Sequence, residues 1–171
     1  MKKIGIFKAM KLCKDYEKMS AEKQQEIQKK RLEEIVEYAR KNSPYYRKLY
    51  QNVPQSFSLT DLPQTDKKNL MENWNDWVCD KELTLEEVEK FMEDTDNIGR
   101  KLKKKYLVFT TSGSTGNPLV SIYDNTANNV MGGISARRSY ARKEDLVAFI
   151  KRGGKSIGVF ADKGFYLGNS S

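Results

Sequence analysis

The spacing of apolar and polar residues predicts that the first half of the chain is mainly helical. Between Ser20 and Tyr50 the apolar side chains recur at helical intervals, and Lys, Glu and Gln occupy the opposite face. Ser20 is a plausible first cap, and the "NSP" of Asn42 to Pro44 is a natural stop. We therefore expect one long amphipathic helix over this segment.

The next segment predicts shorter elements. Residues 51–65 contain two prolines and several turn-forming residues, which indicates a loop with a short helical turn. Asp66 to Trp77 is expected to form one short helix. Thr84 and Glu87 match a capping box, so a further helix should begin there and end by Asp94.

After the basic turn "GRKLKKK", the pattern changes to mixed helix and strand. The β-forming run Tyr106 to Phe109 predicts a strand, and Leu119 to Tyr123 predicts its returning partner. Asp124 should cap a helix that continues to about Ala141. A shorter helix over Glu144 to Ile150 and a buried strand over Ser156 to Phe160 complete the expected order.

This change divides the chain into residues 1–105, a mainly helical region, and residues 106–171, the beginning of an α/β domain. The predicted fold class is therefore α/β. A chain of 171 residues with 38% hydrophobic residues can bury a modest core. It contains no apolar stretch long enough to cross a bilayer, which favours a soluble protein.

The start of the chain and the two cysteines favour a cytoplasmic location. "MKKIGIFKAMKLCK" begins like a signal peptide, but Lys8 and Lys11 interrupt its apolar run and no small-residue cleavage site follows. Cys13 and Cys79 stand far apart in sequence without a CxxC motif, so they predict neither a disulfide scaffold nor a zinc site.

The positive charge of the chain is concentrated near its N-terminus. The formal net charge is +8, and residues 1–50 hold 14 Lys and Arg against 7 Asp and Glu. Clustered cations can bind nucleic acid or an anionic membrane. No nucleic-acid fold motif accompanies them, so a solvated basic face is the favoured interpretation, and peripheral membrane contact through the N-terminal segment stays an alternative.

Several kinds of site are disfavoured. The chain has no histidine, which removes Ser-His-Asp and Cys-His catalysis. "GGKS" at Gly153 to Ser156 lacks the first glycine of a Walker A loop, because Phe149 stands there, and it predicts a tight turn instead. "DTDNIG" at Asp94 to Gly99 lacks the ligands that a calcium loop requires.

The segment "TTSGSTGNPLV", Thr110 to Val120, is the strongest candidate for a binding site. It follows a strand directly and offers hydroxyls, unpaired backbone N–H groups and glycines that allow close approach to a ligand. Such a loop suits phosphate oxygens, and the alternative is a simple hairpin turn. The candidate phosphate-binding residues are Thr111, Ser112, Gly113, Ser114, Thr115 and Gly116.

"TSGSTGNP" at Thr111 to Pro118 resembles the signature of the adenylate-forming enzymes, the acyl-CoA synthetase-like superfamily. "QKKRLEEIVEYARKNSPYYRKLY" at Gln28 to Tyr50 and "LTDLPQTDKKNLMENW" at Leu59 to Trp74 resemble the phenylacetate-CoA ligase branch, particularly its CapK-type members associated with capsular polysaccharide biosynthesis. These motifs stand in the family's order and cover most of the chain from Ser20.

The resemblance implies an ATP- and Mg2+-dependent ligase that activates a carboxylic acid as an acyl-adenylate and transfers the acyl group, usually to coenzyme A. The loop would hold the β- and γ-phosphates of ATP, with Pro118 fixing its exit. Family loops commonly carry a Lys beside the proline, where this chain has Asn117 and Leu119. Lys105 or Arg137 could supply the missing charge.

The family's adenine-binding segment, its metal-associated Glu, its ribose-binding Asp and its C-terminal Lys all come later in the chain than Ser171. The resemblance therefore implies an incomplete large domain and a piece that is inactive by itself. Two alternatives stay open. One is an acyl-protein synthetase of the same fold, and the other is a non-catalytic binding or scaffold module with a relic phosphate loop.

Overall fold

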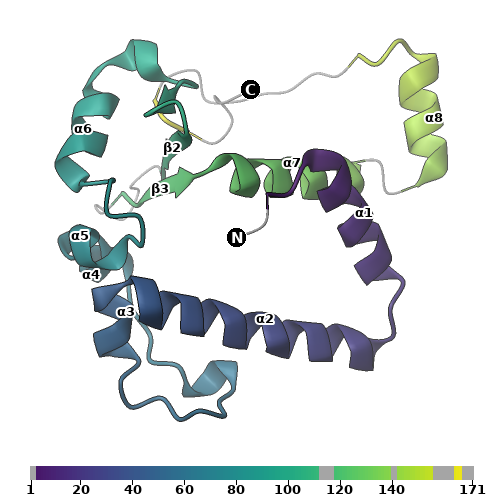
Figure 1. Ribbon diagram of the computed structural model, residues 1–171. Coiled ribbons are helices and arrows are strands. Elements are labelled where there is room, and N and C mark those ends of the chain that lie inside the picture. Colours follow the sequence, from purple (N-terminus) through teal and green to yellow (C-terminus); the bar gives the residue numbers. More distant parts are fainter. Residues whose placement is uncertain (1–2, 112–117, 140–141, 156–163, 167–171) are drawn as a thin grey trace. The chain divides into compact units, whose positions relative to one another are not determined.

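The computed structural model describes residues 3–111, 118–139, 142–155 and 164–166, and it is rich in helix with one small sheet (Figure 1). The sheet is antiparallel and has the strand order β1-β2-β3. This content agrees with the predicted mixture of helix and strand. The chain forms two compact units: Met1–Met19 with Ile98–Phe109 and Ser121–Ser171, and Ser20–Asn97 with Thr110–Val120.

In the first unit, the sheet begins with a tight basic turn. β1 (Lys101–Leu102) pairs with β2 (Tyr106–Thr110) so that Leu102 lies opposite Tyr106. Lys103 and Lys104, between the two strands, have φ angles of 52° and 58°, in the left-handed region. Two consecutive left-handed residues match the twist of a two-residue hairpin. From the sequence this stretch was predicted only as a turn, and β1 was not predicted.

β2 forms the buried centre of this sheet. Its residues Tyr106 to Phe109 are each no more than 5% exposed, and the ring of Phe109 meets that of Tyr123 on β3 (Val120–Tyr123) edge to face at 5.2 Å. The strands predicted over Tyr106 to Phe109 and over Leu119 to Tyr123 are confirmed. The predicted strand at Ser156 to Phe160 lies outside the described residues.

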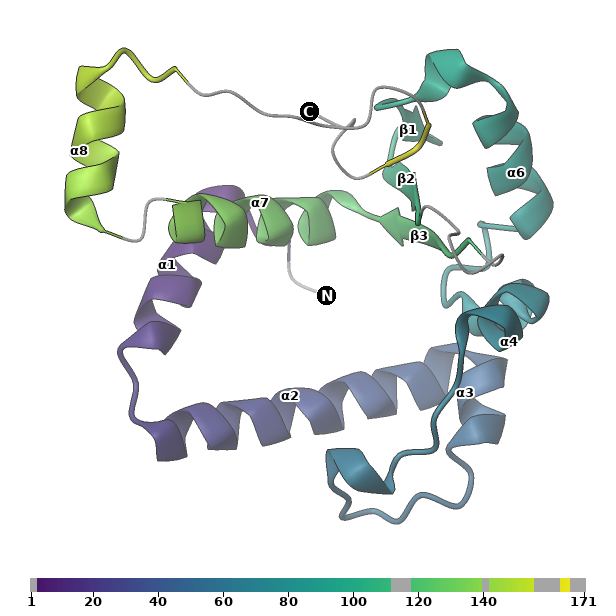
Figure 2. The ribbon, with the colours of Figure 1, turned by 180° about the vertical axis from the view of Figure 1, so that it is seen from behind.

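Two helices of the first unit pack closely on one another. α1 (Ile6–Glu17) contacts α7 (Asn125–Ser139), and they lie side by side in both views (Figure 1 and Figure 2). A Cβ at Gly133 would fall 2.6 Å from the Cβ of Ala9, so only a glycine permits this approach. α1 was not predicted from the sequence, because Lys8 and Lys11 interrupt its apolar run.

The remaining helices of this unit agree with expectation. Asp124 caps α7 as predicted, its carboxylate accepting from the N–H of Ala127 at 2.7 Å. α8 (Lys143–Lys151) matches the predicted short helix. It is followed by a tight turn in which Gly153 and Gly154 have φ angles of 77° and 68°.

The second unit is built on α2 (Ala21–Asn42), the long helix that the sequence predicts. Ser20 caps its first turn by accepting from the N–H of Lys23. Ser43 then ends α2 and begins the next helix, and its fully buried hydroxyl donates to the carbonyl of Asp76 at 2.9 Å. This bond ties the corner after α2 to a helix far along the chain.

Short helices complete the second unit: α3 (Pro44–Leu49), η1 (Leu59–Asp61), α4 (Lys67–Glu72), α5 (Trp74–Trp77), α6 (Leu85–Glu93) and η2 (Thr95–Asn97). Thr84 caps α6 as predicted, accepting from the N–H of Glu87 at 3.3 Å. The single helix predicted over Asp66 to Trp77 is wrong. The helix breaks at Asn73, whose side-chain amide donates to the carbonyl of Asn69 and competes with helical continuation.

A small core lies between these helices. Val36, Phe57, Leu83 and Val88 are each at most 7% exposed, and Trp74 is 2% exposed with its indole N–H donating to the carbonyl of Leu83 at 3.0 Å. The buried indole therefore has a hydrogen-bond partner, and this bond links α5 to Leu83, two residues before the start of α6.

Candidate functional site

Two hydrogen bonds between Thr111 and Leu119 join the two ends of the candidate phosphate loop, and we call this pair of bonds the neck. The N–H of Thr111 donates to the carbonyl of Leu119 at 3.0 Å, and the N–H of Leu119 donates to the hydroxyl oxygen of Thr111 at 2.9 Å. These bonds hold the end of β2 beside the approach to β3. Thr111 and Leu119, the two ends of the candidate segment, are therefore fixed to each other.

Of the six predicted phosphate-binding residues, only Thr111 is described, and Ser112 to Gly116 lie outside the described residues. Thr111 already has a structural role at the neck, because both its N–H group and its hydroxyl oxygen are engaged with Leu119. Its hydroxyl proton is not used in these bonds. Thr111 can thus offer a ligand one donor but not its backbone N–H.

The two cations that could replace the missing loop lysine have other positions and partners. Lys105 precedes the first residue of β2, whereas the loop follows the last, so the two are separated by the length of a five-residue strand, roughly 16 Å. Its ammonium lies 4.5 Å from the ring centre of Tyr106. Arg137 forms an ion pair with Glu17 at 2.6 Å. Neither arrangement supports a role at the loop.

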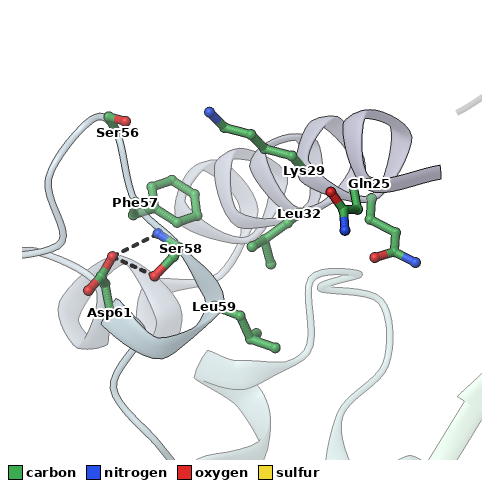
Figure 3. Close-up of a pocket in the computed structure, with 9 residues that line it drawn as sticks. Gln25, Lys29, Leu32, Ser56, Phe57, Ser58, Leu59 and Asp61 are labelled. Atoms are coloured by element: carbon green, nitrogen blue, oxygen red, sulfur yellow. Dashed lines mark hydrogen bonds between the residues drawn. The ribbon is translucent and has the colours of Figure 1, made fainter. Parts of the chain in front are cut away.

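The second unit contains a groove that the sequence analysis did not predict. It has a volume of about 760 Å³ and lies between α2 and the turn that carries η1 (Figure 3). Leu32, Phe57 and Leu59 give it an apolar wall, and Leu32 and Leu59 point into it (Figure 3). Its polar lining consists of Gln25, Gln28, Lys29, Ser56, Ser58 and Asp61.

A capping box holds the turn that forms one side of this groove. The carboxylate of Asp61 accepts from the N–H of Ser58 at 2.7 Å and from its hydroxyl at 2.8 Å. These two bonds lower the pKa of Asp61, since they favour its ionised form. The S-x-x-D spacing of Ser58 and Asp61, beside the apolar Phe57, was the signal in the sequence that could have indicated this turn.

Neither cysteine is placed as an activated nucleophile. Burial raises the pKa of the Cys79 thiol. Burial and the neighbouring carboxylate of Glu17 raise that of Cys13, whose thiol donates to this carboxylate at 3.5 Å. A raised pKa keeps the thiol protonated at neutral pH and lowers its reactivity.

The described residues provide no ready metal site and no membrane span. Among them, no three His, Cys, Asp or Glu side chains lie close enough together to hold a metal ion. No described helix has the length and the apolar character needed to cross a bilayer. At the neck itself, Thr111, Pro118 and Leu119 supply no carboxylate, so an Mg2+ ion there would have to be held largely by phosphate oxygens.

Comparison with known proteins found no matching family model, no matching curated protein and no matching solved structure. We therefore infer a function from the motifs of the chain and from the geometry just described.

Proposed function

We propose that the chain carries the phosphate-binding hairpin of an adenylate-forming ligase, similar to the phenylacetate-CoA ligase and CapK-type branch. Such a ligase activates a carboxylic acid with ATP and Mg2+ and passes the acyl group to a thiol, usually that of coenzyme A. The observation that carries the proposal is the neck formed by Thr111 and Leu119 beneath "TSGSTGNP".

The neck supports phosphate binding through entropy. Fixing the two ends of a chain segment removes part of the conformational freedom that ligand binding would otherwise have to remove. In sequence the neck follows directly on β2, whose residues Tyr106 to Phe109 are buried. Hydroxyl, glycine and backbone N–H groups on such a loop are the groups that surround phosphate oxygens in proteins. When bound, ATP would supply the electrophilic phosphorus, and the loop would hold its leaving pyrophosphate.

Binding of pyrophosphate and of Mg-ATP to the 15N-labelled chain tests this proposal. We expect the amide resonances of residues 111–119 to shift on titration, whereas resonances of α6 stay in place. Unmoved loop resonances at millimolar pyrophosphate would contradict the proposal.

The missing lysine provides a sharper test. We expect Asn117→Lys to tighten pyrophosphate binding roughly tenfold, because a charge-assisted hydrogen bond to phosphate contributes about 1.5 kcal/mol. Asn52→Lys is the matched control. Asn52 is exposed and belongs to the segment Ser20–Asn97 of the second unit, whereas the loop belongs to its segment Thr110–Val120. Equal tightening by both variants would show a general effect of charge and no phosphate site at the loop.

A non-catalytic binding module is the second candidate. It is favoured by one observation, namely that Lys105 and Arg137 are engaged away from the loop and leave its lysine unreplaced. In that case Asn117→Lys would create phosphate binding that the natural chain lacks. The titration of the unmodified chain distinguishes the two candidates.

A further inference from the structure

One face of helix α1 packs against α7. Just before the start of α1, the carbonyl of Ile4 accepts from the side-chain amide of Asn129 on α7 at 3.0 Å. At the end of α1, Glu17 pairs with Arg137 of α7 at 2.6 Å. Between these contacts Ala9 is 5% exposed. α1 is therefore held along its length, and the direction of its outer face within this unit is fixed.

That outer face carries one aromatic residue in line with lysines. Phe7, Lys11, Lys14 and Lys18 follow at intervals of four, three and four residues, so they form a single stripe along the helix. We call these four residues the outer stripe. The side chain of Phe7 is 83% exposed, the highest value among the exposed large hydrophobic residues of the described chain.

The stripe is surrounded by further positive charge. Lys3 and Lys8 are exposed beside it. The two acidic residues of α1 are already neutralised in part, since Asp15 pairs with Lys11 at 3.0 Å and Glu17 pairs with Arg137. Each pair also offsets one cation, Lys11 among them. Residues 3–18 nevertheless hold five lysines against two carboxylates, so this helix presents a net positive charge whose natural complement is a negatively charged surface.

We propose that the outer stripe of α1 docks on the surface of an anionic phospholipid bilayer, with α1 lying parallel to the membrane plane. An aromatic side chain is favourable at the level of the headgroups, and lysines can keep their ammonium groups in water while their stems lie along the interface. Each lysine gains from the negative potential of anionic lipids. Neither signal alone gives stable attachment, and the stripe combines both.

The composition of the stripe favours a bilayer over nucleic acid. Single strands are bound by several aromatic residues that stack on successive bases, and duplex sequence is read by Arg or Lys at guanine and by Asn or Gln at adenine. The outer stripe has one aromatic residue and no Arg, Asn or Gln. This docking is independent of the proposed phosphate hairpin, because it uses none of its residues.

Co-sedimentation of the full chain with vesicles tests the inference. We expect binding to vesicles of phosphatidylcholine with about a third phosphatidylserine, loss of this binding at high salt, and no binding to phosphatidylcholine alone. The triple change Lys11→Glu, Lys14→Glu and Lys18→Glu should abolish binding. Phe7→Ala should weaken it by roughly fivefold to tenfold, because the ring is only partly buried at the interface.

Matched variants make the result specific to α1. Lys29→Glu, Lys30→Glu and Lys41→Glu change the charge of the exposed face of α2 by the same amount, and Leu59→Ala removes another exposed apolar side chain, 69% exposed. These should reduce binding much less. Circular dichroism of each variant shows whether it folds, and Lys→Gln versions of the α1 triple keep the test valid if charge reversal unfolds the chain.

Two results would overturn the inference. The first is equal vesicle binding by the α1 triple and the α2 triple. The second is tighter binding to single-stranded or duplex DNA than to phosphatidylserine vesicles at the same ionic strength, with Phe7→Ala affecting only the DNA. Either result would assign the charge of α1 to another partner or to no particular partner.

Discussion

Gly133 shows how one missing side chain permits the packing of two helices. A Cβ at this position would lie 2.6 Å from the Cβ of Ala9 and 2.8 Å from the carbonyl oxygen of Ile6. Neither atom belongs to the end of a flexible side chain. We therefore expect Gly133→Ala to lower the free energy of unfolding by about 1–3 kcal/mol, as overpacking does in other cores.

Gly132 provides the matched control for this substitution. Its added Cβ would meet the Cδ1 of Ile6 at 3.2 Å, and that atom can move. Because alanine favours a helix over glycine by about 1 kcal/mol, Gly132→Ala should be neutral or slightly stabilising. Urea denaturation followed by circular dichroism compares the two. Similar effects of both substitutions would mean that the α1 and α7 contact is looser than the structure shows.

Ser43 is a second small residue that stabilises the fold, through two hydrogen bonds of its buried hydroxyl. Its hydroxyl donates to the carbonyl of Asp76, and its oxygen accepts from the N–H of Tyr46 at 3.3 Å. Ser43→Ala removes both bonds and leaves a carbonyl without this partner. We expect a loss of about 2 kcal/mol in the free energy of unfolding.

The comparison for Ser43 is Ser20→Ala, which removes a cap at the exposed start of α2 and should cost about 1 kcal/mol or less. Urea denaturation monitored by tryptophan emission is suitable, because Trp77 directly follows Asp76. If Ser43→Ala costs no more than Ser20→Ala, the bond to Asp76 adds nothing to stability.

At the scale of elements, one of the two hydrogen bonds of the neck is accepted by a side-chain hydroxyl. Thr111→Val keeps the size and the strand preference of the side chain but removes the acceptor of the Leu119 N–H. We expect hydrogen exchange at this amide to accelerate about fivefold, which corresponds to a loss of about 1 kcal/mol. Thr111→Ser retains the oxygen and should exchange nearly as slowly as the natural chain. Equal exchange in both variants would assign the neck to the backbone bond alone.

Elements that carry their own local signals could be predicted from sequence. Ser20, Thr84 and Asp124 each accept a backbone hydrogen bond at the start of the expected helix. Local chemistry fixes such caps, so sequence alone reveals them. By contrast, β1 is two residues long and exists through its pairing with β2, and α1 depends on its contact with Gly133, more than a hundred residues later.

The groove beside α2 illustrates the same limit. Its turn has a local signal in Ser58 and Asp61, but its volume arises because Leu32 of α2 faces Leu59 of the turn across it (Figure 3). No periodicity within either segment indicates that the two will meet. Tertiary contacts of this kind can be inferred only after the elements are placed.

At the scale of the whole molecule, the chain does not divide at a single point in sequence. Residues 1–19 belong with the C-terminal segments, and the segment around the candidate loop belongs with residues 20–97. Both tryptophans, Trp74 and Trp77, lie in the second unit. Tryptophan emission therefore reports the unfolding of this unit, whereas circular dichroism reports the helices of both.

The second unit should lose stability in alkaline solution. Burial raises the pKa values of Tyr46, Tyr50 and Cys79, so the folded unit holds these protons more tightly than the unfolded chain does. This contribution is fully present below the unfolded pKa values, about 8.5 for Cys and about 10 for Tyr. It is lost as the pH rises through the higher folded values, because the unfolded state then binds fewer protons. We expect the urea midpoint from tryptophan emission to fall across this range.

The double change Tyr46→Phe and Tyr50→Phe should flatten this fall of the urea midpoint, whereas Tyr38→Phe, at a tyrosine 48% exposed, should leave it unchanged. A midpoint that falls equally in all three proteins would show that the partly buried phenols of Tyr46 and Tyr50 are not its cause.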